Sequence, residues 1–530
     1  MLFTSYEFLL FLIVLVLVYY AIPRKYQWQL LLIASYIFYA SAGVHYIIYI
    51  IGTTLTTYIA SVNINKLLLQ QTEYVKSNRE TLSRDERKAY KGSMKKKQRA
   101  WMISCLVFNF GILAVIKYTD FAISNVNSLF STFGVDNELP FFRFALPLGI
   151  SFYTFQTMGY IIDIYREKYT YEKNVFRLAL FVSFFPQLIQ GPISRFDDLK
   201  KTLFSEHSID MVKISYGLQR ILWGYFKKLV IADRLLVGVT TIVGNPQEYQ
   251  GVYVLLGMFF YAIDLYCDFT GGIDIVICIA QVLGIDVVEN FIRPYFSKSI
   301  TEYWRRWHIS LGTWFKDYIF YPISVSKSML DFSKKSRKWL GNGIGKRIPV
   351  YVSSIVVWFI TGIWHGAAWN FVVWGLINGI VILISQECTP LYDKFHNRFK
   401  VADKLWFRMF QITRTFWLMS FIRTLDCYRD VSTTFRMYGT IFTKRNYNEL
   451  FNGGLLKLGL SIEDYVLLIV CVLIVFIVSM IQRSGSVRDK LAAKPIAVRY
   501  AIYFALFLAI LIFGAYGVGY DSSQFIYSQF

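Results

Sequence analysis

Two of the five histidines in this 530-residue chain lie in aromatic-rich sequence and could perform acid–base chemistry. His365 lies in GIWHGAAWNF, inside a stretch without charged residues that runs from residue 348 to residue 386. His308 lies in SITEYWRRWHISLGTWFKDYIFYPI, residues 299–323. Poor hydration disfavours the charged form of an imidazole, and the neutral form is the one that a general base needs. His365 is therefore the first candidate for a catalytic base, and His308 is the second.

Each histidine also has a simpler interpretation as a buried structural residue that donates one N–H group to a carbonyl. A metal site formed by the pair is not expected. The two histidines are 57 positions apart, and neither has a second histidine at helical spacing or a cysteine partner. The six cysteines are scattered and contain no CxxC pair, so they indicate neither a metal cage nor a disulfide framework.

The composition indicates the kind of structure that must position these residues. The chain is 55% hydrophobic and 17% charged, whereas a soluble protein carries about 25% charged residues. Its apolar residues form blocks long enough to cross a bilayer as helices. The clearest blocks are 5–22, 27–42, 45–61, 101–116, 351–386, 465–482 and 500–518, and less pure ones lie near 144–164, 176–193, 214–232, 252–284 and 404–422. These blocks predict an all-α, polytopic membrane protein whose first block is a retained span.

The positive charges are distributed as membrane topology requires. Residues 63–100 contain eleven Lys or Arg and four acids, and residues 326–348 contain seven basic residues and one acid. Residues 118–142 and 237–251 contain acids but no Lys or Arg. The positive-inside rule then predicts cytoplasmic basic loops and an external N-terminus. The net charge of +21 thus reflects topology and attraction to membrane lipid, and no nucleic-acid partner is expected.

The uncharged stretch 348–386 should cross the membrane twice, because basic residues flank both of its ends. Two crossings of about 20 residues each use up the stretch. His365 then falls near the turn of this hairpin, towards the outer side, or deeper in the membrane if the hairpin is re-entrant.

The chain divides by composition into N-terminal spans with a basic loop (1–142), a catalytic core (143–403) and a C-terminal accessory region (404–530). The core has polar residues within or beside its apolar runs, and irregular or charged groups at membrane depth are tolerated where they line a wet cavity or are buried in protein. These residues are Gln156, Asp163, Gln187, Gln190, Asp264, Asp268, Asp274 and Asn290. There is no GxxxxGK[ST] motif, no GxSxG motif and no matching pair of halves, which argues against a nucleotide-driven pump, a serine hydrolase and an inverted-repeat transporter.

An ordered series of motifs resembles the membrane-bound O-acyltransferase (MBOAT) family, in the bacterial branch typified by alginate O-acetyltransferase. The motifs are MLFTSYEFLLF (1–11), LPLGISFYTFQTMGYIIDIYR (146–166), FFPQLIQGPISRF (184–196), LQRILWGYFKKLVIADR (218–234), LYCDFTGGIDIVICIAQVLGI (265–285), ENFIRPYFSKSITEYWRRWHISLGTWFKDYIFYPI (289–323), TGIWHGAAWNFVVWGLING (361–379) and QFIYSQF (524–530). Two segments follow the family pattern loosely, DFTGG with Gly272 and the tract 421–432. Neither is expected to touch the two histidines.

The resemblance implies a bundle of about 11–13 helices around a central funnel, in the cytoplasmic (inner) membrane. It assigns the catalytic histidine to His365 and a second functional histidine to His308. Arg305 and Arg306 would help to orient the donor, and Asp268 and Asn290 are weaker candidates for the polar wall, with helix packing as their alternative role.

The resemblance further implies transfer of an acyl group, acetyl by preference. The donor would be a cytoplasmic thioester, acetyl-CoA or an acyl carrier, that binds as substrate with no resident cofactor. The acceptor would be hydroxyls of an extracytoplasmic polysaccharide, reached directly or through an SGNH-type esterase-like partner protein. Two alternatives stay open, D-alanyl transfer to teichoic acid and a non-catalytic polysaccharide exporter or flippase.

Overall fold

The computed structural model describes residues 1–135 and 138–516, and the motif QFIYSQF lies outside this part. Within the described residues the secondary structure is helical apart from one isolated antiparallel bridge between Phe291 and Trp307. Seven helices are long and apolar enough to cross a membrane, and a shorter apolar helix covers Tyr6–Ala21. The prediction of an all-α, multi-pass membrane protein is confirmed, while the central funnel stays a prediction.

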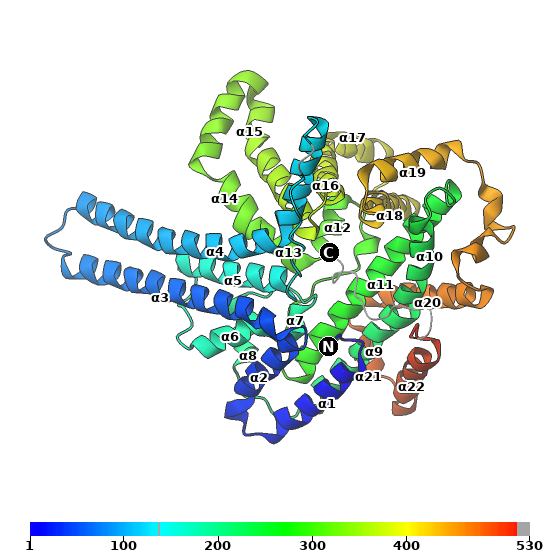
Figure 1. The fold of residues 1–530 in the computed structure, drawn as a ribbon, viewed down its shortest axis with the longest axis horizontal. Coiled ribbons are helices and arrows are strands. Elements are labelled where there is room, and N and C mark those ends of the chain that lie inside the picture. Colours follow the sequence, from blue (N-terminus) through cyan, green and yellow to red (C-terminus); the bar gives the residue numbers. More distant parts are fainter. Residues whose placement is uncertain (136–137, 517–530) are drawn as a thin grey trace. The chain divides into compact units, whose positions relative to one another are not determined.

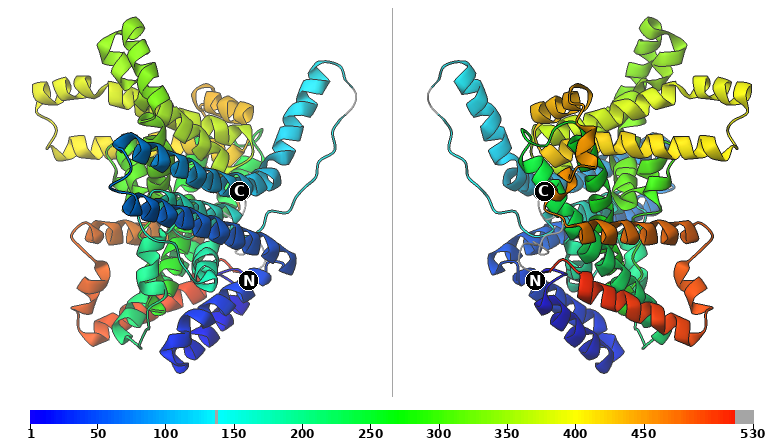
Figure 2. Two further views of the ribbon diagram at one scale, coloured as in Figure 1. Left: turned by 90° about the vertical axis from the view of Figure 1, so that its left-hand side faces the viewer. Right: turned by 90° about the vertical axis from the view of Figure 1, so that its right-hand side faces the viewer.

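The chain forms two compact units, each described here by itself. The first unit contains residues 6–210 and 280–288. Its helices are α1 (Tyr6–Ala21), α2 (Gln27–Ala40), α3 (Ile47–Ser77), α4 (Arg84–Thr132), α5 (Ile150–Tyr165), α6 (Val175–Ser183), α7 (Phe185–Leu188) and α8 (Phe196–Leu203). Helices α3 and α4 lie side by side in both views (Figures 1 and 2). The apolar block 176–193 is not one span, because the chain breaks after α6 and again after α7.

The second unit contains residues 211–279 and 289–530, and therefore both candidate histidines. Its helices are α9 (Met211–Tyr225), α10 (Asp233–Gly244), α11 (Val252–Val282, whose last turn belongs to the first unit), α12 (Ile300–Arg306), α13 (Ile309–Phe315), α14 (Tyr321–Ser324), α15 (Lys327–His365), α16 (Trp369–Glu387), α17 (Thr389–Phe399), α18 (Leu405–Tyr428), α19 (Val431–Thr443), α20 (Ile462–Gln482), α21 (Val487–Ala492) and α22 (Ile496–Phe513). Two π-helical segments, 226–232 and 316–320, precede α10 and α14. The division into 1–142, 143–403 and 404–530, which was based on composition, stays a prediction.

The two strongly basic regions are helical, which corrects their description as loops. Helix α3 continues to Ser77, and α4 begins after Ser83 with a capping box that Ser83 forms with Glu86. Residues 327–365 form one helix interrupted at Gly341, where φ is +72°. The Ser333 hydroxyl donates to the carbonyl of Gly345 at 2.7 Å, so the two segments fold back on each other. Lys, Arg, Glu and Gln are good helix formers, which explains why charged sequence continues the helices beyond the apolar blocks.

The predicted hairpin over the uncharged stretch is present as α15 and α16. The two charged residues that bound the stretch meet at its base, where Arg347 and Glu387 form an ion pair of 2.6 Å. Gly362 and Gly375 allow the helices to approach closely, because a Cβ on Gly375 would lie 2.3 Å from the carbonyl oxygen of Trp358. Helix α15 rises roughly 27 Å from Arg347 to His365, about the thickness of a hydrocarbon core.

Candidate active site

His365 is the last residue of α15 and lies at the turn of the hairpin. Its side chain is buried, with 5% exposure, between two indoles: the ring centroids lie 5.0 Å from Trp364 and 4.7 Å from Trp374. The partial negative charge at the C-terminal end of a helix favours a cation there. Helix α15 would thus stabilise the imidazolium that forms when His365 accepts a proton.

His308 lies between α12 and α13 in a left-handed backbone conformation, with φ +49° and ψ +51°. Such a conformation is uncommon outside glycine and is found when the surroundings enforce it. Here the segment after α11 pairs with the end of α12, through the Phe291–Trp307 bridge and a bond from the Ile292 N–H to the Arg306 carbonyl of 3.0 Å. Residues 290–292 and 306–310, which we call the clamp, hold His308 in place.

Asn290 fixes the ring of His308 from within the clamp. Its Oδ1 accepts the backbone N–H of Ser310 at 2.9 Å and the Ser310 hydroxyl at 3.0 Å. The amide Nδ2 therefore faces the imidazole, and it lies 3.3 Å from Nδ1 of His308. An amide NH₂ can only donate, so Nδ1 accepts and the neutral ring carries its proton on Nε2. Burial, with the charge of Arg423 as a second cause, lowers the pKa of His308 to about 3 and keeps the ring neutral.

The two histidines contact the same tryptophan. The ring of Trp364 lies 5.6 Å from His308 and 5.0 Å from His365, in both cases edge to face. Phe269 of α11 covers another side of His308 at 5.2 Å. The structure thus brings together the two residues that were selected from sequence 57 positions apart.

Arg423 of α18, in the tract 421–432, belongs to the same cluster through its contacts with tryptophans, and the expectation that this tract does not touch the histidines themselves stays a prediction. Its guanidinium carbon lies 4.8 Å from the ring centroid of Trp307 and 5.3 Å from that of Trp374, the indole that also contacts His365. Asp426 forms an ion pair with Arg423 at 3.3 Å, and both side chains are 5% exposed. The sequence signal that could have marked this ion pair is an Arg and an Asp three positions apart at the end of one apolar block.

Helix α16 is fixed to its neighbours by buried asparagines. Asn378 accepts the indole N–H of Trp304 at 3.1 Å, which links α16 to α12. Asn370 donates to the carbonyl of Leu425 at 3.1 Å, which links the start of α16 to α18. These bonds position Trp374 between His365 and Arg423.

Asp268 is held in an ion-pair cluster, and none of its described contacts is with either histidine. Lys228, from the π-helical segment before α10, lies 2.6 Å from Asp268 and 2.7 Å from Asp233. All three side chains are at most 2% exposed. These ion pairs agree with the alternative role for Asp268, which is helix packing. Asn290, in contrast, contacts His308 directly.

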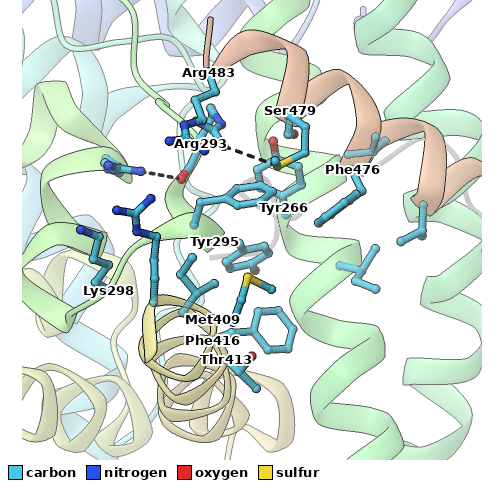
Figure 3. Close-up of a pocket in the computed structure, with 18 of the residues that line it drawn as sticks. Tyr266, Arg293, Tyr295, Lys298, Met409, Thr413, Phe416, Phe476, Ser479 and Arg483 are labelled. Carbon is cyan, nitrogen blue, oxygen red and sulfur yellow. Dashed lines mark hydrogen bonds between the residues drawn. The ribbon is translucent and has the colours of Figure 1, made fainter. Parts of the chain in front are cut away.

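The two arginines before His308 have different surroundings. Arg306 forms a 2.5 Å ion pair with Glu302 of the same helix and lines a neighbouring pocket (Figure 3). Arg305 is exposed and is not part of that lining. Among the described residues, no group of three His, Cys, Asp or Glu could hold a metal ion.

Comparison with known proteins agrees with the motifs. The model of the MBOAT, membrane-bound O-acyltransferase family, matches residues 46–425, which include both histidines and Arg423. A probable alginate O-acetylase of Pseudomonas aeruginosa is 34% identical over 392 residues, which are 73% of this chain and 66% of the relative. A probable alginate O-acetylase of Pseudomonas putida is 31% identical over 446 residues, 84% of this chain and 80% of the relative.

A peptidoglycan O-acetyltransferase of Helicobacter pylori is 29% identical over 392 residues, 69% of this chain and 66% of the relative. This chain thus spans about two thirds of the length of several relatives, which leaves its acceptor and donor to be proposed. At the level of the family, the prediction of an acyltransferase is confirmed. By its motifs, its helical architecture and these matches, the chain belongs to the membrane-bound O-acyltransferase family.

Proposed function

We propose that this protein transfers an acyl group, acetyl by preference, from a cytoplasmic thioester to hydroxyls of an extracytoplasmic polysaccharide, and that it resides in the cytoplasmic membrane. The observation that carries the proposal is that two buried histidines, His308 and His365, both contact the ring of Trp364 in a chain of this family. The preference for acetyl rests on the names of the relatives, which are O-acetylases and an O-acetyltransferase.

His365 acts as the general base. It accepts the proton of the attacking hydroxyl while the hydroxyl oxygen forms a bond with the thioester carbonyl carbon. The C–S bond then breaks, and the departing thiolate takes the proton from the imidazolium. General-base catalysis contributes about 10²–10⁴ in rate. The position of His365 at the end of α15 favours the transient positive charge.

His308 acts as a hydrogen-bond donor and not as a base. Its Nδ1 accepts from Asn290, so the proton lies on Nε2 and can be donated to the carbonyl oxygen of the donor as negative charge develops there. Arg306 and the more exposed Arg305 are on the helix just before His308, where they would orient an anionic donor as it enters. No resident cofactor is needed for this chemistry.

The acceptor hydroxyl can belong to the polysaccharide itself or to a serine of an SGNH-type partner that relays the acyl group. Both routes use the same proton transfer at His365. They differ in whether the purified protein can acetylate a glycan without a second protein.

The test is the ester-linked acetate content of cell-surface glycans in cells that express wild type, His365→Ala or His45→Ala at equal membrane levels. His45 is exposed and belongs to the first unit, so it serves as the matched control. The proposal expects acetate to disappear from one polymer with His365→Ala, while the polymer is still exported and His45→Ala has no effect. Unchanged acetate with His365→Ala would overturn the role of His365.

The same samples distinguish the two alternatives. Loss of ester-linked D-alanine in place of acetate would identify D-alanyl transfer. Loss of the polymer itself from the cell surface, with its remaining acetylation unchanged, would identify an exporter.

A further inference from the structure

A pocket of about 740 Å³ lies in the second unit, beside the clamp. Four α-helices line it: α11 through Phe259, Ile263, Tyr266 and Cys267, α12 through Glu302 and Arg306, α18 through residues 405–417, and α20 through residues 472–480. Residues of the segment 293–298 and Arg483, which follows α20, complete the lining. The volume lies within the range of about 300–1,000 Å³ that is typical of ligand sites. Helices α11 and α20 are both long and apolar enough to cross a membrane, so the pocket lies beside two candidate spans.

The charged side chains that line this pocket are mostly basic. Its lining contains five basic residues and one acid, Glu302, which is already paired with Arg306 at 2.5 Å. The basic residues are Arg293, Lys298, Arg306, Arg408 and Arg483. In Figure 3, Arg293 and Arg483 lie together at one end, and Met409, Thr413 and Phe416 lie at the other. The pocket is thus amphipathic, with a cationic end and an apolar body.

The positive charges of the basic side chains in the lining are incompletely neutralised. The Nε atoms of Arg293 and Arg408 are buried and have no hydrogen-bond partner among the described residues. Burial, together with the charges of Arg306 and Arg483, lowers the pKa of Arg293. The backbone of Arg293 has φ +49°, a left-handed conformation that is uncommon outside glycine. Like charges and buried donors without partners are costly, and an anion between them removes both costs.

We propose that the pocket binds one anionic phospholipid, whose phosphate lies among Arg293, Arg408 and Arg483 and whose chains lie along the apolar faces of α11, α18 and α20. The lipid is favoured over a soluble anion because most of the lining is aromatic or aliphatic. Arg483 follows α20 and begins the segment 483–499, which contains five Lys or Arg and one acid and is therefore expected to be cytoplasmic. Basic pockets between spans bind lipid headgroups on that side.

The bound lipid also supports the clamp. Tyr295 lines the pocket, and its ring stacks on Trp307 at 6.1 Å, one residue before His308. On its other side, Tyr295 contacts Phe416 of α18 at 5.1 Å. A lipid that fills the pocket therefore restrains the residues that hold His308.

The test uses the full-length protein, purified in detergent and delipidated, with native mass spectrometry to count bound lipid. It is titrated with phosphatidylglycerol and with phosphatidylcholine of the same chain length. We expect the anionic lipid to bind at least tenfold more tightly. We expect Arg293→Gln/Arg408→Gln to weaken its binding by about 25-fold, at about fivefold per basic residue. The control Lys394→Gln/Arg398→Gln removes two charges from α17, outside the pocket, and should leave binding unchanged.

Equal binding of the two lipids, or an equal loss in the control, would overturn the proposal. Displacement of phosphatidylglycerol by micromolar coenzyme A would also overturn it, because the pocket would then be a site for a soluble anion. If the double arginine variant does not fold, Thr413→Trp gives the answer, since it fills the apolar body without changing charge. It should abolish retention of phosphatidylglycerol.

Discussion

The side-chain nitrogen of Asn290 lies 3.3 Å from Nδ1 of His308, while its oxygen accepts two hydrogen bonds from Ser310. This arrangement sets the tautomer of His308, because an amide nitrogen cannot accept a proton. In the proposed mechanism, His308 is then the hydrogen-bond donor through Nε2, and His365 is the base. Two histidines that look alike in sequence are thereby given different chemical roles.

Asn290→Asp should therefore reduce acyl transfer strongly while keeping the size and shape of the side chain. A carboxylate in place of the amide NH₂ would accept from Nδ1–H, which moves the proton of the neutral ring or protonates the ring fully. We expect acyl transfer to fall about 10²–10³-fold, the cost of losing one oriented donor. The ester-linked acetate content of cell-surface glycans, at equal membrane levels of each variant, measures the loss by either route. Asn245→Asp, at an exposed helix end, is the control, and equal acetate content with the two variants would contradict the tautomer assignment.

The burial of His308 predicts that stability falls in mild acid. Its pKa is lowered from 6.5 to about 3, so between these values the unfolded chain binds a proton that the folded chain does not. Stability is then complete above pH 6.5 and is lost as the pH falls, by about 2 kcal/mol between pH 7 and pH 5. The unfolding temperature in detergent measures the loss. His308→Asn, which tolerates the left-handed backbone and can still accept from Asn290, should show a shallower slope. Equal slopes would show that other groups cause the loss.

Part of this site could be predicted from sequence because its signal is local. The hairpin follows from the absence of charge between Arg347 and Glu387, and these two residues do form the ion pair at its base. The position of His365 at the turn follows from the same stretch, because His365 lies near its middle. The basic region 63–100 was predicted as a loop because it is the charged sequence between two apolar blocks, whereas its residues favour helix once α3 and α4 can pack together.

The rest of the site depends on pairings that no local pattern records. Lys228 meets Asp268 across 40 positions, and the π-helical segment that presents Lys228 has no periodic signature. Arg423 reaches the tryptophans beside the histidines from a helix that looked like an accessory region. Its tract departs from the family pattern, so resemblance did not mark it either. The packing of α16 against α12 and α18 brings Arg423 beside Trp374, which is also a neighbour of His365.

Arg423→Gln should both destabilise the protein and change the site. Removing one partner of a buried ion pair costs about 3–5 kcal/mol, because Asp426 would be left without its partner. Arg423→Met with Asp426→Leu should recover much of the unfolding temperature but not the activity, since the charge beside Trp374 and His308 is still missing. Recovery of both by the double variant would show that Arg423 has only a structural role.

Asp268→Asn should behave as a stability variant. It weakens one of the two ion pairs of Lys228, and a buried charge with fewer partners is destabilising. We expect a lower unfolding temperature and a lower folded yield, with the rate per folded molecule kept within about threefold, well short of the 10²-fold cost of losing a catalytic group. A fall of 10²-fold or more in the rate at an unchanged unfolding temperature would instead place Asp268 in the polar wall.

Gly375→Ala tests whether the close approach of α15 and α16 positions His365. The added Cβ would lie 2.3 Å from the carbonyl oxygen of Trp358 and 3.0 Å from Cα of Gly362, both backbone atoms that cannot rotate away. The helices must then separate, and a shift of 1 Å in a catalytic group costs about 10²-fold in rate. Gly439→Ala is the matched control, because nothing lies within 4 Å of its Cβ. We expect Gly375→Ala to lose acyl transfer while binding of a thioester analogue is largely kept. If activity survives, His365 is positioned by its tryptophan neighbours and not by the contact between the two helices.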